Sequence, residues 1–385
     1  MLIGIDARFF GPKAKGLGRY AQKLIEELER VDDRNDYLIF LRRVNFDEYQ
    51  PRNPRFKKVL ADWRWYSLGE QLFFPWQLYR YNIDLMHFTH FNAPLFYRRP
   101  MVVTIHDLIL QRWPTCKNNF LSRAKYFFKN LGYKIVIRSA LSRAKKIIAV
   151  SQFVKDDIIK SFGVADEKVE IIYEGAPEAI NNQQSTTNNK IILERYGIKK
   201  PYLLYVGNAY PHKNLARLIK AFKILIKDKS DDLQLVLAGE EDYFYRYLKE
   251  FYNSIILCSM IELSEKRKVV FTGFVQEREL SCLYANAALY VFPSLCEGFG
   301  LPPLEVMAHG TPVVSSDATC LPEILGSAAH YFDAQNIADI AAKIKEVLVD
   351  DDLRQKLIAA GFEQIKKYSW RQMAEETVSV YGFVD

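Results

Sequence analysis

The chain has 385 residues, more than one ordinary core holds, so we expect two domains. Apolar residues make up 49% of it, which excludes a disordered protein. Its five cysteines are scattered, odd in number and form no CxxC pair, which argues against a disulfide framework and a structural zinc site and favours a reducing cytoplasm.

The first residues, MLIGIDARFF, lack the basic and apolar regions of a signal peptide. No run of about 18 apolar residues occurs anywhere, so we expect no membrane-spanning helix. The expected location is cytoplasmic, with peripheral binding to the inner face of the cell membrane left open.

The positive charge lies in the first half of the chain. Residues 1–150 carry 27 basic and 13 acidic residues, a net of +14, whereas the remainder has a net of −7. Residues 112–146 hold ten basic residues, several aromatics and no acid. Such a stretch can bind an anionic membrane or another polyanion, or it is a solvated helix face whose aromatics enter the core. No nucleic-acid-binding module is recognisable, so nucleic acid is not an expected partner.

Strand and helix signals alternate along the chain, which predicts parallel sheets with helical crossovers. In the first half, Ser151 is expected to cap the helix that follows the last strand. The expected elements there are a helix over 19–30 and strands over 2–6, 37–41, 85–88, 101–105 and 146–150.

Residues 178–190, EAINNQQSTTNNK, are polar and predict a linker. The predicted domains are 1–178 and 191–367, joined by a linker over 179–190, with a final helix near 368–385 packing back on the first domain. Beyond the linker the expected strands are 202–206, 233–238, 268–271, 288–292 and 312–315, and the expected helices are 215–225, 302–308, 336–349, 351–367 and 370–381.

The segment PSLCEGFGLPPLE, 293–305, is the most informative one. It leaves an apolar strand and enters a helix, and Gly298 and Gly300 allow a sharp turn and a close approach to a ligand. Amides at such a helix start form a natural phosphate site. Glu297 and Glu305 can line the same cleft. Taken singly, Glu297 also fits an exposed glutamate in a turn, and Glu305 fits a glutamate near a helix start that the helix dipole stabilises.

This segment has the E-x7-E spacing, at Glu297 and Glu305, of the retaining glycosyltransferases of family 4. The chain resembles that family over nearly its whole length. The resemblance implies the α/β GT-B fold, with two Rossmann-like domains whose parallel sheets face a central cleft. It is strongest at GIDARFFGPKAKGLGRY, at HFNAPL and VVTIHDLI, at YVGNAYPHKN, and over 291–323.

The resemblance also implies roles on the donor side. Glu297 would bind hydroxyls of the donor sugar, Glu305 the ribose, and Lys213 the diphosphate, where many relatives add an arginine and this chain has Asn208. Lys213, Glu297 and His106 are the expected catalytic residues. Further donor contacts are expected from Gly16, Asn208, Gly239, Val275, Gly298, Phe299, Gly300 and Leu301.

His106 and Asp107 end an apolar strand, where sites form in α/β proteins, although a lone histidine is more often structural. The resemblance places His106 at the sugar, and Asp107 is expected to orient it. Arg19, His87, His90 and Asp107 are the expected acceptor residues.

These observations predict a retaining transferase that moves a hexose from a GDP- or UDP-linked donor to a glycan or lipid-linked glycan. The specific guess is mannose from GDP-mannose, in polysaccharide biosynthesis. No cofactor or metal is expected, because a protein cation can serve the diphosphate. The alternatives are a nucleotide-sugar epimerase, or a carbohydrate- or polyanion-binding protein without catalysis.

Overall fold

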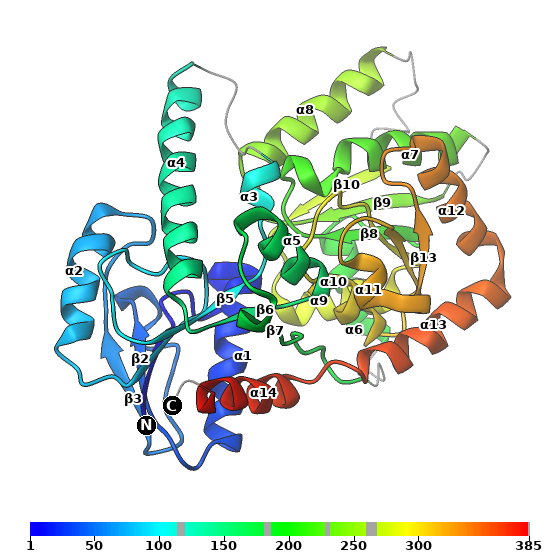
Figure 1. Cartoon of the computed structure of the whole chain (residues 1–385). Helices are drawn as coiled ribbons and strands as arrows, with labels where there is room; N and C mark the ends of the chain where they lie inside the picture. The colour runs from blue at the N-terminus through cyan, green and yellow to red at the C-terminus, as the bar shows by residue number, and fades with distance from the viewer. Residues whose placement is uncertain (114–119, 181–185, 228–231, 259–267, 384–385) are drawn as a thin grey trace. The chain divides into compact units, whose positions relative to one another are not determined.

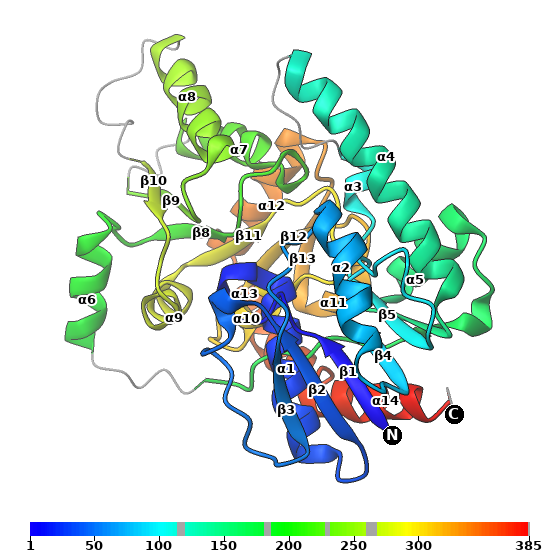
Figure 2. The same cartoon turned by 90° about the vertical axis from the view of Figure 1, so that its left-hand side faces the viewer.

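Two parallel sheets organise the chain into two units (Figures 1 and 2). The computed structural model describes residues 1–113, 120–180, 186–227, 232–258 and 268–383. The N-terminal unit holds Met1–Gly175 and Tyr368–Asp385, and the C-terminal unit holds Ala176–Lys367. Each unit is an α/β sandwich of its own.

The N-terminal sheet has seven strands in the order β3-β2-β1-β4-β5-β6-β7, all paired in parallel. Its strands are β1 Leu2–Asp6, β2 Asp36–Leu41, β3 Phe56–Leu60, β4 Leu85–Phe88, β5 Met101–Ile105, β6 Lys146–Ala149 and β7 Val169–Ile171. Its helices are α1 Lys15–Val31, α2 Leu68–Tyr79, α3 Ile109–Arg112, α4 Phe120–Arg143, α5 Gln152–Phe162 and α14 Trp370–Gly382.

The C-terminal sheet has six parallel strands in the order β10-β9-β8-β11-β12-β13. They are β8 Tyr202–Val206, β9 Gln234–Ala238, β10 Val269–Gly273, β11 Leu289–Phe292, β12 Val313–Ser316 and β13 Ala329–Phe332. The helices are α6 Thr186–Arg195, α7 Leu215–Lys227, α8 Tyr243–Cys258, α9 Glu277–Asn286, α10 Leu301–Met307, α11 Leu321–Leu325, α12 Ile337–Val349 and α13 Asp351–Ile365.

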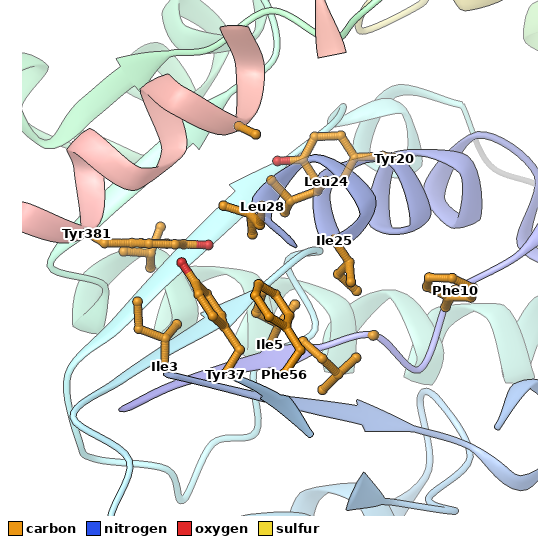
Figure 3. Packing of buried hydrophobic residues seen from close by; sticks show 14 of the residues in the cluster. Ile3, Ile5, Phe10, Tyr20, Leu24, Ile25, Leu28, Tyr37, Phe56 and Tyr381 are labelled. Atoms are coloured by element: carbon orange, nitrogen blue, oxygen red, sulfur yellow. The ribbon is translucent and has the colours of Figure 1, made fainter. Parts of the chain in front are cut away.

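The last helix, α14, belongs to the N-terminal unit (Figure 3). Its Tyr381 is fully buried in the cluster formed by β1, β2 and α1, among residues such as Ile3, Tyr37 and Leu28. The Tyr381 hydroxyl also lies 2.6 Å from Nδ1 of His87 on β4. Helix α14 therefore contributes to the same hydrophobic core as β1, β2 and α1.

The elements expected from periodicity are present within one or two residues, apart from helix starts such as that of α1, and Ser151 caps α5 by accepting a hydrogen bond from the Val154 amide. The expected linker over 179–190 differs, because α6 begins at Thr186; residues 181–185 lie outside the described part of the chain. The apolar residues that follow the polar run continue this helix, and they outweigh the weak local preference of threonine and asparagine.

Candidate active site

Each sheet has one place where the strand order reverses, between β1 and β4 and between β8 and β11. In open parallel sheets the loops leaving the strands at such a point form the ligand crevice. The predicted site residues follow these strands, His90 after β4, Lys213 after β8 and Glu297 after β11, or follow neighbouring strands.

The structure brings Lys213 and Glu297 into direct contact. Nζ of Lys213 donates to Oε1 of Glu297 at 2.6 Å, and both side chains keep a small exposed fraction, 15% and 10%. An ammonium has three donors, so two N–H groups of Lys213 remain for other acceptors. The pair is neutral as a whole, and its ammonium offers two further N–H donors at the ends of β8 and β11.

Backbone contacts hold the two loops in register. The amide of Leu295 donates to the carbonyl of His212 at 2.7 Å, beside Lys213. Nδ2 of Asn214 donates to the carbonyls of Pro293 at 3.1 Å and Ala334 at 2.7 Å. Asn214 itself is left-handed, with φ of 62°, a conformation that asparagine tolerates. The chain is thus anchored at the residue before Lys213 and at the residue after it.

The glutamate loop turns into α10 through Gly300, whose φ of 103° requires glycine. The amide of Glu297 donates to Oγ1 of Thr319 at 3.1 Å, and Sγ of Cys320 donates to the carbonyl of Phe299 at 3.3 Å. Gly298, Phe299 and Leu301 are buried. Thr319 and Cys320 were not predicted, since they lie more than twenty residues further along the chain.

Glu305 lies in α10 and is half-buried. The hydroxyl of Tyr284, from α9, donates to its Oε2 at 3.1 Å. Tyr284 is held in turn, because Oγ1 of Thr311 donates to its carbonyl at 2.6 Å. Sequence reasoning missed Tyr284, which carries no motif of its own and reaches Glu305 only through the tertiary packing of α9.

The loop after β8 also contains Asn208, whose carbonyl accepts the Tyr205 hydroxyl at 2.8 Å. A Cβ atom on Gly239 would lie 2.0 Å from the carbonyl oxygen of Gly207, so only glycine allows this approach of the β8 and β9 loops. Val275 is buried after β10, whereas its neighbour Phe274 is 72% exposed. Gly239 and Val275 therefore lie at the same edge of the sheet as Lys213 and Glu297.

His212 lies beside the Lys213–Glu297 pair and is 5% exposed. Burial, and then the charge of Lys213, lower the pKa of His212 to about 4. The imidazole is therefore neutral at physiological pH, and Lys213 remains the cation of this loop.

In the N-terminal unit, His106 bonds through both ring nitrogens. Nε2 lies 3.0 Å from the carbonyl of Thr89 and Nδ1 lies 2.9 Å from Oε1 of Glu174. Burial alone would lower the pKa of His106, but the hydrogen bond and charge of Glu174 outweigh it and raise that pKa. Both acceptors favour a doubly protonated ring. The partner is Glu174, which follows β7, and not the expected Asp107, whose Oδ1 accepts the amide of Ile109 at 2.9 Å.

His87 is placed in the core and not at a surface open to an acceptor. It is fully buried on β4, with Nδ1 at the Tyr381 hydroxyl and Nε2 at 2.8 Å from Oγ1 of Thr104. Burial lowers its pKa to about 3. Its neighbour His90 lies in an aromatic cluster, with Nε2 at 2.9 Å from the Tyr66 hydroxyl and its ring 6.3 Å from that of His106.

The glycines after β1 differ in what surrounds them. Gly16, the expected donor contact, is exposed in the first turn of α1, and a Cβ there would meet nothing within 4 Å. A Cβ on Gly18 would lie 1.9 Å from the carbonyl oxygen of Gly11. Arg19, half-buried, is next along the helix. Gly18 is therefore the glycine that the turn requires.

A buried ion network lies under this loop and was not predicted from the motif IDAR. Arg8 contacts Asp6 through Nε and Nη2, both at 2.7 Å, and Glu70 of α2 through Nη1 at 2.7 Å. Nδ2 of Asn92 donates to Glu70 at 2.5 Å. This network ties β1 to α2 and to the loop after β4.

Two units with parallel sheets, a Lys213–Glu297 pair at the strand ends of the second sheet and Glu305 in the helix that follows are features of glycosyltransferases of the GT-B fold. Residues 14–179 match the family described as Glycosyltransferase Family 4, and residues 189–364 match the family described as Glycosyl transferases group 1. An uncharacterized glycosyltransferase of Methanocaldococcus jannaschii is 31% identical over 77% of this chain and 73% of its own. The chain belongs to this family of glycosyltransferases.

Two further similarities cover almost the whole chain. The O-antigen chain mannosyltransferase B of Escherichia coli is 29% identical over 382 residues, 95% of each protein. Among solved structures, Anabaena HepE in complex with UDP and glucose has a TM-score of 0.72 at 19% identity, over 99% of both chains. The latter likeness shows the fold.

Two features concern metals and membranes. In the described ranges, no three His, Cys, Asp or Glu side chains are grouped so that they could hold a metal ion. Across that same part of the chain, every helix is too short or too polar to span a bilayer.

Proposed function

We propose that this protein is a retaining mannosyltransferase that uses GDP-mannose and extends a glycan or a lipid-linked glycan in polysaccharide biosynthesis. The observation that carries the transfer chemistry is the contact between Lys213 and Glu297 at the strand ends of β8 and β11. The similarity to an O-antigen chain mannosyltransferase over 95% of both chains supports mannose as the sugar.

In this proposal Lys213 stabilises the leaving diphosphate. Charge builds on the diphosphate oxygens as the sugar bond breaks, and a preorganised ammonium in a shielded site lowers that barrier. The two free N–H groups of Lys213 supply the contacts, while Glu297 holds the ammonium in place. Because Asn208 stands where many relatives have an arginine, Lys213 carries this task without a second cation.

Glu297 and Glu305 divide the remaining donor contacts. Glu297 accepts hydrogen bonds from sugar hydroxyls, and Glu305 accepts those of the ribose, held in its rotamer by Tyr284. Gly298, Phe299, Gly300 and Leu301 supply backbone contacts to the donor. We assign the nucleotide to the same sheet edge, and the close approach at Gly239 and the buried Val275 support this assignment.

The N-terminal unit supplies the acceptor side in this proposal. Of its residues we assign Arg19 to the acceptor and His106 and Gly16 to the donor sugar, and the basic stretch 112–146 brings the enzyme to an anionic membrane surface that carries the acceptor. The His106 ring is already bonded to Glu174 and to the carbonyl of Thr89, so we assign it a second role in holding the loops after β4 and β7 together.

Thermal shift with GDP, UDP, ADP and their sugar conjugates tests the donor assignment, with Glu305→Ala beside the wild type. A ligand that binds only the folded protein raises its melting temperature. We expect GDP and GDP-mannose to stabilise the wild type and to lose most of this effect in the variant. Stabilisation by UDP conjugates alone would replace GDP, and no response to any nucleotide would overturn the donor site.

Transfer activity should also persist in chelator, because Lys213 supplies the positive charge at the diphosphate. The assay follows release of GDP from GDP-mannose with and without EDTA. Activity lost in EDTA and restored by magnesium or manganese would contradict this role of Lys213.

A further inference from the structure

The helix α2 exposes an apolar face with no charged side chain. Glu70 is the one charged residue between Leu68 and Tyr79, and it is fully buried in its contact with Arg8. The exposed residues recur at helical spacing, so they share one side of the helix. They are Leu68, Leu72, Phe73 and Trp76, exposed by between 51% and 82%.

Basic side chains border this apolar face. The guanidinium of Arg80 lies 3.7 Å from the ring centroid of Trp76, and Arg64 is exposed just before the helix. Helix α4 adds two exposed apolar residues, Leu131 and Ile135. On α4 the exposed bases beside them are Lys129, Lys134 and Arg138.

Contacts within the N-terminal unit connect α2 and α4, whose ribbons are drawn beside each other in Figure 2. Nζ of Lys129 lies 5.9 Å from the ring of Tyr66, which precedes α2. The ring of Phe91 contacts Tyr133 of α4, with centroids 4.9 Å apart. The Tyr79 hydroxyl donates to the carbonyl of Phe96 at 3.0 Å, and Phe96 is itself exposed. The loop over 91–99 therefore bridges the two helices.

The segment that carries this surface is strongly basic. Residues 63–155 hold fifteen lysines and arginines and three acids, and of these acids Glu70 is buried while Asp84 and Asp107 are not. A second copy of the chain would bring two basic rims together, which is unfavourable. An anionic bilayer offers the opposite charge at its surface and an apolar layer directly beneath.

We infer that α2, the loop 91–99 and residues 129–138 form a docking face for an anionic phospholipid bilayer, with α2 as the inserted element. Trp76 sits at the level of the headgroups with Arg80 over its ring, an arrangement typical of tryptophan at membrane interfaces. The aliphatic stems of the lysines and arginines lie along the apolar layer while their charges reach the phosphates. The inference extends the membrane role that the proposed function gives to 112–146, and it does not depend on the donor.

Flotation with vesicles of phosphatidylcholine, with and without phosphatidylglycerol, tests this face on the full chain. We expect binding to the anionic vesicles only. The double substitution Leu72→Gln with Trp76→Gln should lower the partition coefficient at least about tenfold, because apolar area no longer leaves water. The matched control is Tyr247→Gln in the C-terminal unit, since Tyr247 is 61% exposed and Trp76 is 60% exposed.

Charge is tested separately with Lys134→Gln and Arg138→Gln. Each should weaken binding to the anionic vesicles about fivefold, and added salt should remove the difference. Lys356→Gln, exposed on α13, is the control. Equal binding by wild type and the α2 double variant, or equal binding to neutral and anionic vesicles, would overturn the inference. A dimer in sedimentation that the double variant abolishes, without vesicle binding, would assign the face to a second copy instead.

Thermal shift with GDP-mannose separates this inference from the proposed function. The α2 double variant should respond to the nucleotide as the wild type does, since α2 and the Lys213–Glu297 pair lie in different units. Vesicle binding without a nucleotide response would leave the docking face standing and reject the donor site.

Discussion

The charged residues near the strand ends differ between the two units in burial and in how many of their hydrogen-bonding groups are already used. In the N-terminal unit Arg8 and Glu70 are completely buried and bonded to each other, and His106 is held by Glu174. In the C-terminal unit Lys213 and Glu297 remain partly exposed, and Lys213 keeps donors for further partners. The comparison is consistent with the proposed function, in which the first set of charges shapes loops and the second set is left to contact the donor.

The largest effect should come from the exposed pair. Lys213→Gln removes the positive charge at the diphosphate, and loss of one preorganised contact of this kind costs about 10²- to 10³-fold in kcat. GDP release from GDP-mannose measures it. Lys199→Gln, an exposed lysine of the same unit, should leave kcat unchanged. Wild-type kcat in Lys213→Gln would show that Lys213 does not stabilise the diphosphate, and the proposed difference between the charged residues of the two units would then be wrong.

The N-terminal loop should respond in stability. Gly18→Ala places a Cβ atom 1.9 Å from the Gly11 carbonyl, and we expect it to lower the free energy of unfolding by about 1–3 kcal/mol. Gly16→Ala meets open space in α1 and should be neutral or raise stability by up to about 1 kcal/mol.

Tryptophan fluorescence during urea unfolding measures the stability of the N-terminal unit in both glycine variants. All five tryptophans lie in the N-terminal unit, at 63, 65, 76, 113 and 370. Equal stability of the two glycine variants would show that the loop after β1 can move away from Gly18.

The sequence predicted the C-terminal site more completely than the N-terminal one. Lys213, Glu297 and Gly300 lie in short motifs whose spacing alone places them at strand ends, and the structure puts them there. Glu174 could have been suspected, because it follows a strand in the same way. Arg8 precedes α2 by sixty residues, and its pairing with Glu70 arises from tertiary packing that no local pattern encodes.

The two histidines of the N-terminal sheet show the same limit. Both His87 and His106 lie at apolar strands, and the sequence does not tell which one faces Tyr381 and which one Glu174. Helices α2 and α4 also escaped a specific prediction, because amphipathic periodicity is weak in both and most of the apolar residues of α2 are exposed.

These histidines predict opposite dependences of stability on pH. His106 has a raised pKa in the folded state, so its contribution is fully present below the unfolded value of about 6.5 and is lost as pH rises through the folded value. His87 has a folded pKa of about 3, so its contribution is present above about 6.5 and is lost as pH falls toward 3.

Urea unfolding followed by tryptophan fluorescence across pH 5 to 9 measures both dependences. One proton changes the free energy of unfolding by at most about 1.4 kcal/mol per pH unit. Glu174→Gln should remove the fall in stability above pH 6.5 and leave the fall at acidic pH in place. If Glu174→Gln left the loss of stability at alkaline pH unchanged, a group other than His106 would cause that loss. The bond between His106 and Glu174 would then not stabilise the N-terminal unit as the comparison requires.

The smallest effect is expected from the hydrogen bond between Tyr284 and Glu305, in which a structural residue contacts a residue proposed to bind the donor. Tyr284→Phe removes the hydroxyl that donates to Glu305, a hydrogen bond worth about 0.5–1.5 kcal/mol. If Tyr284 positions Glu305 for the ribose, GDP affinity should fall about threefold to tenfold while kcat at saturating GDP-mannose stays the same. Tyr202→Phe, which removes a buried hydroxyl bonded to the Leu283 carbonyl in the same unit, is the control and should change stability without changing GDP affinity. Equal loss of affinity in both variants would mean that Tyr284 acts through general packing, and Glu305 would then hold its position without it.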